Sequence, residues 1–327
     1  MASPALKIKT KQRNLSSKRN QKLKKAADGA YKDISRVSLI SSSFAVSEAE
    51  VKLAIAYWAQ RSVLLKRPVG IKRKKDLLCA HSLETRILEL KKAFSAKEAS
   101  DFVWALRGGY GFQELIPHLK KKDLSDSKIF MGFSDSTSLH YFLNKSLGLP
   151  SLHSPHPNWF AENENKKIST EISAFLKEPH VFSPVFKGLK RLNVSPVKNI
   201  NAKIIGGNLT TLVSMIGTKY DLGAKSDILF LEELEEPAYK INRMLTHLSQ
   251  SNFLKGAKAV VFGHLNHSSL NQEKLIKAVV KRWALHQSFP VLSGMSAGHV
   301  HQKNHPFWLG KKSTLVLDEK PRLLNNV

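Results

Sequence analysis

Short apolar runs alternate with helix-like segments in the first half of the chain, and this alternation limits the fold more than any other feature of the sequence. Strands that alternate with helices favour a parallel sheet with helices on its faces. The apolar runs lie in residues 36–46, 62–68, 102–111 and 128–133 and predict strands. Helices are predicted at residues 47–62, where Ser47 is a good N-cap, and at 81–101 and 136–148.

The second half of the chain repeats this alternation after a less regular, proline-containing stretch. Strands or strand–helix units are predicted in residues 202–218, 227–248, 257–265, 289–302 and 313–318, and a helix is predicted in residues 271–286. We therefore expect an α/β protein with two domains. A Rossmann-like (flavodoxin-like) N-terminal domain with a parallel sheet takes residues 34–150, a connection takes 151–200, and a smaller C-terminal α/β domain takes 201–327.

The chain is strongly basic, with a formal net charge of +26 and a pI near 10.0. Part of this charge is local, because residues 1–25 are rich in lysine and arginine and contain no acidic residue. We interpret residues 1–33 as a disordered basic tail. Such a tail can contact polyanions such as nucleic acid nonspecifically, or it can be a solvated segment with no dedicated partner.

The sequence also indicates where the protein resides. Cys79 is the only cysteine, so no intramolecular disulfide can form. No apolar run approaches the roughly 18–20 residues of a membrane span, and no apolar segment of a secretory signal follows the basic N-terminus. We expect a cytoplasmic protein without a membrane span.

Ser134 lies at a corner between a predicted strand and a predicted helix, in the sequence GFSD. Serine and aspartate are good helix N-caps, so capping is one interpretation of this corner. The other is a nucleophile elbow, in which the serine attacks a carbonyl. At a helix start, the backbone N–H of Asp135 would point toward the resulting oxyanion.

Two further motifs follow predicted strands. In RGGYG, the N–H of Gly109 is a candidate for a second oxyanion donor, although a tight turn explains the glycines as well. The motif is neither a phosphate-binding loop nor a complete dinucleotide-binding signature. In FLEELEEP, Glu232 follows the apolar strand directly and is placed to orient a histidine, whereas Glu235 and Glu236 are expected in an exposed acidic loop.

Histidines are concentrated near the C-terminus. A metal site is one interpretation, because His-x-His is a ligand spacing, but few acids are nearby and no HExxH pattern exists. The alternative is that His299, in a loop of small residues after a strand, is a general base. Ser134, Glu232 and His299 then form a triad, which is recognised by roles rather than by sequence position. The histidines concentrated near the C-terminus, from which His299 is taken, are His264, His267, His299, His301 and His305.

Several motifs in order resemble the serine LD-carboxypeptidase family, which includes muropeptide LD-carboxypeptidases and microcin C immunity peptidases. The resemblance runs from about residue 36 to residue 318 and covers nearly all of the predicted globular chain. It rests on RGGYG (107–111), GFSD (132–135), GGNL (206–209), LFLEELEEPAYKINRML (229–245) and GHVHQKNHPFWLG (298–310). LHSPHP resembles the family's His-Gly-Pro connection, with Ser154 where a glycine is usual.

The resemblance implies roles for individual residues. Ser134 would be the nucleophile, His299 the general base, and Glu232 the acid that orients it. The backbone N–H groups of Gly109 and Asp135 would form the oxyanion hole. The active site would lie in the cleft between the two domains, without a cofactor or metal, in a protein that is commonly a homodimer. Expected substrate contacts are Gly108, Tyr110 and Asn208.

The implied reaction is release of the terminal D-alanine from peptidoglycan tetrapeptides during murein turnover or recycling, so the implied partner is a muropeptide. Two alternatives stay open from the sequence. The first is hydrolysis of a peptidyl-nucleotide antibiotic of the microcin C kind. The second is a catalytically inactive relative that binds nucleic acid through its basic surface.

Overall fold

The computed structural model describes residues 34–71, 78–162 and 165–326. The basic segment 1–33 lies outside the described residues, so its disorder and its contact with polyanions stay predictions.

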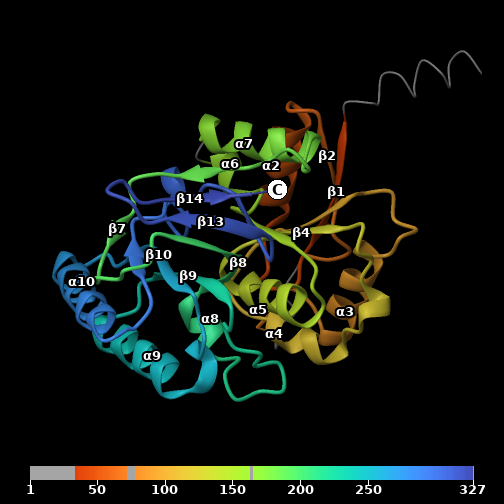
Figure 1. The fold of residues 1–327 in the computed structure, drawn as a ribbon. Coiled ribbons are helices and arrows are strands. Elements are labelled where there is room, and N and C mark those ends of the chain that lie inside the picture. Colours follow the sequence, from red (N-terminus) through yellow and green to blue (C-terminus); the bar gives the residue numbers. More distant parts are fainter. Residues whose placement is uncertain (1–33, 72–77, 163–164, 327) are drawn as a thin grey trace, which may run out of the picture.

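Two β-sheets form the framework of the molecule (Figure 1). In the first, five neighbouring strands are parallel and only β12 is antiparallel. The parallel N-terminal sheet predicted from the alternation is confirmed. Its strands are, in order across the sheet, β12 (Phe307–Leu309), β5 (Ser151–His153), β4 (Ile129–Gly132), β3 (Phe102–Ala105), β1 (Ser35–Ile40) and β2 (Val63–Lys66).

The second sheet has eight strands and is mixed. Its centre, from β8 to β11, is parallel, and antiparallel strands extend it on both sides. The prediction of two α/β units is therefore confirmed. The strands are, in order, β6 (Val185–Phe186), β14 (Arg322–Asn325), β13 (Lys312–Val316), β8 (Asn199–Asn208), β9 (Asp227–Leu234), β10 (Ala259–Asn266), β11 (Val291–Ser293) and β7 (Lys190–Arg191).

Helices cover both faces of the first sheet (Figure 1). On one face, α2 (Glu48–Ala59), α6 (Trp159–Glu162) and α7 (Lys166–Lys177) pack on side chains such as Leu39 and Trp104. On the other face lie α3 (Leu83–Ala93), α4 (Phe112–Leu115) and α5 (Thr137–Tyr141). The predicted cap of α2 is present, because Glu50 N–H donates to Ser47 Oγ at 3.1 Å.

One apolar core joins the two units. It contains Ile40 and Phe130 of the first sheet together with Ile205 and Leu229 of the second. Helix α5 packs against β8 and against α8 (Leu209–Val213), and α8 shares the helical face of the second sheet with α9 (Ala238–Gln250) and α10 (Leu270–Leu285). The corner that precedes α5 is thereby held against the second sheet.

The loop 294–306 connects the sheets, because the chain leaves the second sheet after β11 and enters the first as β12, which pairs with β5. The sequence did not predict β12 or β14, because a strand of only three or four residues carries no local sign of its partner strand. The segment predicted as a connection, 151–200, supplies β5, α6, α7, β6 and β7. Within the described part of the chain, no helix is long and apolar enough to cross a membrane.

Candidate active site

Ser134 occupies a strained corner between β4 and α5. Its φ is +62°, a left-handed conformation that costs a non-glycine residue of order 1–3 kcal/mol. A 3₁₀ turn, Ser134–Ser136, follows, and α5 begins at Thr137. The corner is crowded, because a Cβ on Gly132 would lie 2.7 Å from Ser136 Oγ. The sequence prediction of a sharp strand–helix corner is confirmed, and strain at a serine is a feature of nucleophile elbows.

Glu232 comes from β9 in the second sheet and is completely buried. Its carboxylate oxygen Oε2 accepts a hydrogen bond from His299 Nδ1 at 2.6 Å. Gly298 allows this approach: its φ is +115°, and a Cβ there would lie 2.9 Å from Glu232 Oε2. The side-chain amide of Asn304 holds the same turn, since its oxygen accepts from Gly298 N–H at 3.0 Å.

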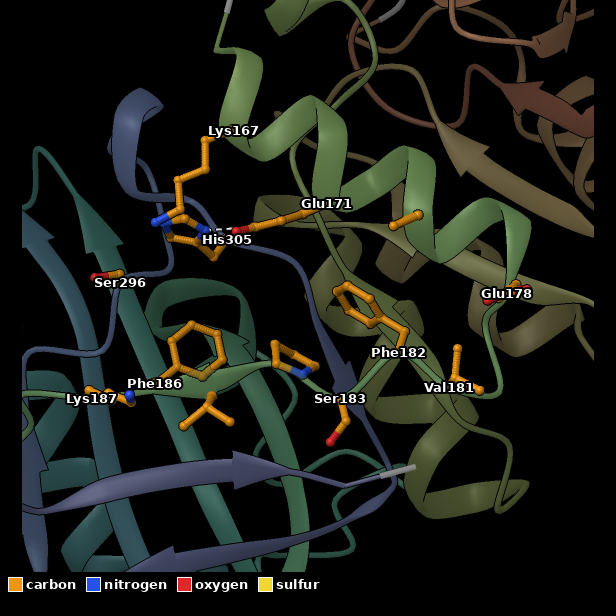
Figure 2. A pocket seen from close by; sticks show the side chains of 13 residues that line it. Lys167, Glu171, Glu178, Val181, Phe182, Ser183, Phe186, Lys187, Ser296 and His305 are labelled. Atoms are coloured by element: carbon orange, nitrogen blue, oxygen red, sulfur yellow. Dashed lines mark hydrogen bonds and ion pairs between the residues drawn. The ribbon is translucent and has the colours of Figure 1, made fainter.

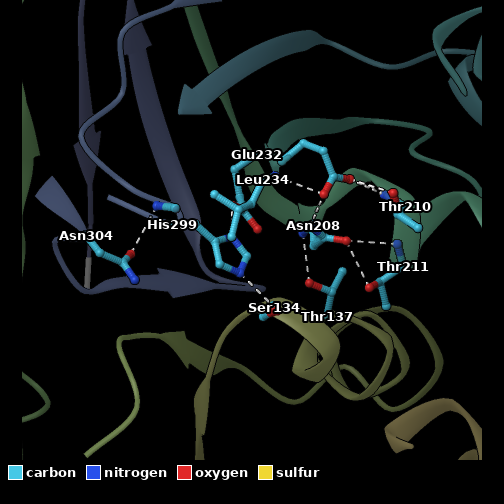
Figure 3. A network of polar contacts seen from close by, with 11 residues as sticks. Ser134, Thr137, Asn208, Thr210, Thr211, Glu232, Leu234, His299 and Asn304 are labelled. Carbon is cyan, nitrogen blue, oxygen red and sulfur yellow. Dashed lines mark hydrogen bonds and ion pairs between the residues drawn. The ribbon is translucent and has the colours of Figure 1, made fainter. Parts of the chain in front are cut away.

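His299 links the two units in a chain of hydrogen bonds (Figure 3). Because Nδ1–H donates to Glu232, Nε2 carries the lone pair and accepts from Ser134 Oγ at 3.0 Å. Burial alone would lower the pKa of His299, but the charge of Glu232 and the hydrogen bond to it raise that pKa above its usual value. An imidazole in this position can take the serine proton and return it to a leaving group.

The glycine turn expected to provide a donor lies directly beside the serine. A Cβ on Gly108 would be 3.1 Å from Ser134 Oγ, so a larger residue there would crowd the serine. Gly109 has a φ of +117° and packs under Phe44. The hydroxyl of Tyr110 donates to Glu114 Oε1 at 3.2 Å, and the side chain is 43% exposed.

The side chain of Asp135 holds the surrounding loops together. Its Oδ2 accepts from Ser43 Oγ, in the serine-rich loop after β1, and from Phe112 N–H at 3.1 Å. Burial raises the pKa of this carboxyl despite those hydrogen bonds. The side chain therefore positions the elbow, while the backbone N–H stays the candidate oxyanion donor.

Asn208 lies at the end of β8, next to Glu232 in the register of β8 and β9. Its amide N–H donates to Glu233 at 2.8 Å, and its oxygen accepts from Thr211 N–H at 3.0 Å as the cap of α8 (Figure 3). The second N–H of this amide is the candidate for the expected substrate contact.

The clustered histidines diverge in the structure, and the described residues contain no group of three or more side chains that could hold a metal. His301 Nε2–H donates to Trp159 O at 2.9 Å and its ring stacks on Trp159. His305 pairs with Glu171 at 2.6 Å beside a cavity of about 430 Å³ between α7 and β6 (Figure 2). Ser134, Glu232 and His299 do not line that cavity.

His156 lies beside the site, although it was not predicted as a site residue; it belongs to the motif LHSPHP. Its Nδ1–H donates to Ala105 O at 2.9 Å, and its Nε2 lies 3.2 Å from the point that a Cβ on Gly108 would occupy. Burial lowers the pKa of His156 to about 3, so the ring is neutral. The ring packs on Phe133, which also contacts the ring of His299 at 4.8 Å between centroids.

Comparisons with known proteins point to one family. Residues 37–154 match the model of the LD-carboxypeptidase N-terminal domain, and residues 201–315 match that of the LD-carboxypeptidase C-terminal domain. The chain is 30% identical to a protein of Rickettsia conorii over 238 residues, which span 70% of this chain and 72% of that protein.

Two similar proteins are named for their activity. The murein tetrapeptide carboxypeptidase of Pseudomonas aeruginosa is 26% identical over 244 residues, which span 72% of this chain and 78% of that protein. The crystal structure of muramoyltetrapeptide carboxypeptidase from Oxalobacter formigenes superposes with a TM-score of 0.77 at 24% identity. This match covers 90% of this chain and 99% of that one, and it shows a shared fold.

Proposed function

Because the chain belongs to the LD-carboxypeptidase family, we propose that it removes the terminal D-amino acid, D-alanine, from murein tetrapeptides. The scissile bond is the amide between an L-configured centre and that D-residue. The observation that carries the proposal is the chain of hydrogen bonds from Ser134 through His299 to the buried Glu232.

In the proposed mechanism, Ser134 Oγ attacks the scissile carbonyl carbon while His299 Nε2 takes the hydroxyl proton. The resulting imidazolium is stabilised by Glu232 and gives its proton to the amine of D-alanine, which leaves. Water then attacks the acyl-enzyme with the same histidine as base and releases the tripeptide.

The backbone N–H groups of Gly109 and Asp135 are the proposed oxyanion donors. Each such donor contributes on the order of 3 kcal/mol to the stability of the transition state. Gly108 and Tyr110 are the proposed substrate contacts on the first unit, and the remaining amide N–H of Asn208 is the proposed contact on the second.

The test uses a matched pair of tetrapeptides that end in D-alanine or L-alanine. We expect the purified protein to release D-alanine from the first and nothing from the second, as measured by chiral chromatography with mass spectrometry. A peptidyl-nucleotide of the microcin C kind, added as a third substrate, tests the alternative activity. Turnover of the peptidyl-nucleotide alone would contradict the murein assignment.

We also propose that the protein acts in the cytoplasm as a homodimer, because the family resemblance implies both. Light scattering coupled to size-exclusion chromatography tests the second point. A mass near the 36.6 kDa of one chain across the micromolar range would contradict a dimer.

A further inference from the structure

A carboxypeptidase must recognise the free carboxylate at the end of its substrate, and the triad alone does not provide a partner for it. The inference below rests on the proposed function. In the substrate, the carboxylate carbon is three bonds from the scissile carbonyl carbon. The carboxylate therefore lies close to Ser134, and a cation on a loop that touches Ser134 is well placed to bind it.

Arg107 lies on such a loop. It follows β3 and immediately precedes Gly108, whose missing side chain leaves room against Ser134 Oγ. Consecutive Cα atoms are about 3.8 Å apart, so the Cα of Arg107 lies about that far from Gly108, the residue that approaches Ser134. Its side chain is 47% exposed, which leaves the guanidinium accessible to a ligand.

The present partners of Arg107 are distant. One N–H reaches Ala45 O at 3.4 Å, and Glu50 Oε1 lies 3.9 Å away. Glu50 is engaged elsewhere, because its other oxygen accepts from Ser47 N–H at 2.6 Å in the cap of α2. A guanidinium has five N–H donors in a planar fork that matches a carboxylate, and these two contacts use few of them.

The charge of Arg107 affects the pKa of His156, which lies beside Gly108. Burial is the main cause of the low pKa of His156, and the charges of His299 and Arg107 lower it further. The charge of Arg107 thus reaches His156, and His156 Nε2 and Ser134 Oγ lie 3.2 Å and 3.1 Å from the same point beside Gly108.

We propose that the guanidinium of Arg107 binds the terminal carboxylate of the substrate and thereby restricts cleavage to the last peptide bond. Lys303, four residues after His299, is the competing cation on the second unit. Arg107 is favoured because it adjoins the glycine beside Ser134 and because its planar fork can make two parallel hydrogen bonds to a carboxylate.

The experiment compares kcat/KM for two tetrapeptides that differ only at the C-terminus, a free carboxylate or a carboxamide. We expect the wild type to prefer the acid by about 10- to 100-fold, the range for hydrogen bonds to a charged group. In Arg107→Gln, the acid should lose this advantage while the amide is turned over within about twofold of wild type. Arg107→Lys should keep part of the preference.

Arg67→Gln is the matched control. Arg67 is similarly exposed, at 46%, and pairs with Glu48, so its substitution removes the same charge from a different loop. It should leave the acid preference unchanged, as should Lys303→Gln.

Three results would overturn the inference: a full acid preference in Arg107→Gln, an equal loss on both substrates in Arg107→Gln and Arg107→Lys, or a preference that disappears in Lys303→Gln. A wild type that cleaves neither peptide would contradict the proposed function itself and overturn the inference with it.

Discussion

Two histidines six residues apart each form a hydrogen bond to a carboxylate through Nδ1, but they differ at the other ring nitrogen. Nε2 of His299 accepts a hydrogen bond from a serine hydroxyl. His299 meets Glu232 and His305 meets Glu171, each with Nδ1 at 2.6 Å from the carboxylate oxygen. The Glu232 side chain is 0% exposed, whereas that of Glu171 is 32% exposed and borders an open cavity (Figure 2).

The proposed catalytic role of His299 therefore rests on more than its hydrogen bond to a carboxylate, because His305 has the same bond. In the buried pair, solvent does not screen the charge of Glu232, so the carboxylate can stabilise an imidazolium. His299 also has Ser134 on its second nitrogen, 3.0 Å away. His305 instead helps to anchor the loop 294–306, since its backbone N–H donates to Ser296 O at 3.0 Å.

Removal of each imidazole gives the largest expected contrast. His299→Ala should lower kcat for tetrapeptide hydrolysis by roughly 10⁴- to 10⁶-fold, because the general base is lost. His305→Ala should change it by less than about tenfold, because a pair partly exposed to solvent contributes about 1 kcal/mol or less. Single-turnover release of D-alanine measures both, and comparable losses in the two variants would contradict the assignment of His299.

Neutralising each carboxylate tests the same contrast at the acid. Glu232→Gln should lower kcat by about 10⁴-fold, since an amide in this position favours the wrong tautomer of the histidine. Glu171→Gln should leave kcat within a small factor of wild type. A Glu232→Gln enzyme that keeps more than a tenth of wild-type kcat would show that the carboxylate is dispensable.

A methyl group added next to the buried pair should have a smaller effect. Gly298→Ala places a Cβ 2.9 Å from Glu232 Oε2 and so displaces the histidine, and misplacement by about 1 Å costs about 10²-fold in rate. Gly294→Ala is the control: φ is also positive, at +94°, but its Cβ meets nothing closer than 3.4 Å. Equal losses in kcat would attribute the effect to backbone strain alone.

The smallest expected effect is a shift in the pH profile. His299 acts as a base only when neutral, and Glu232 raises its pKa above the usual value of about 6.5, so kcat should rise with pH along a limb centred above 6.5. The charge of Glu233 also raises this pKa. Glu233→Gln should therefore move the rise in kcat to lower pH. Glu235→Gln, in the exposed loop, is the control and should not move it. A shift to higher pH in Glu233→Gln would contradict the predicted effect of Glu233 on the pKa of His299.

The sequence was sufficient for the parts of the site that depend on local signals. An apolar run followed by GFSD predicted the corner at Ser134. Glu232 was expected directly after its strand, but it lies within β9, near the carboxyl end. Both residues are near each other because the carboxyl ends of parallel strands meet at one edge of a sheet.

Contacts that depend on tertiary packing could not be predicted in this way. The pairing of β12 with β5, which carries the His299 loop across the two sheets, joins segments about 150 residues apart. The placement of His156 beside Gly108 depends on a loop whose sequence, LHSPHP, has no regular period. Which of the clustered histidines faces a serine is decided by these contacts.

Covalent labelling of the activated serine tests the central claim most directly. The purified protein is treated with a fluorophosphonate, with and without tetrapeptide, and the adduct is located by peptide mass spectrometry. We predict one adduct, on Ser134, that forms more slowly with tetrapeptide present and is absent from His299→Ala. An adduct on another serine, such as Ser43 in the neighbouring loop, or no adduct from an enzyme that still releases D-alanine, would contradict the assignment of Ser134 as the nucleophile.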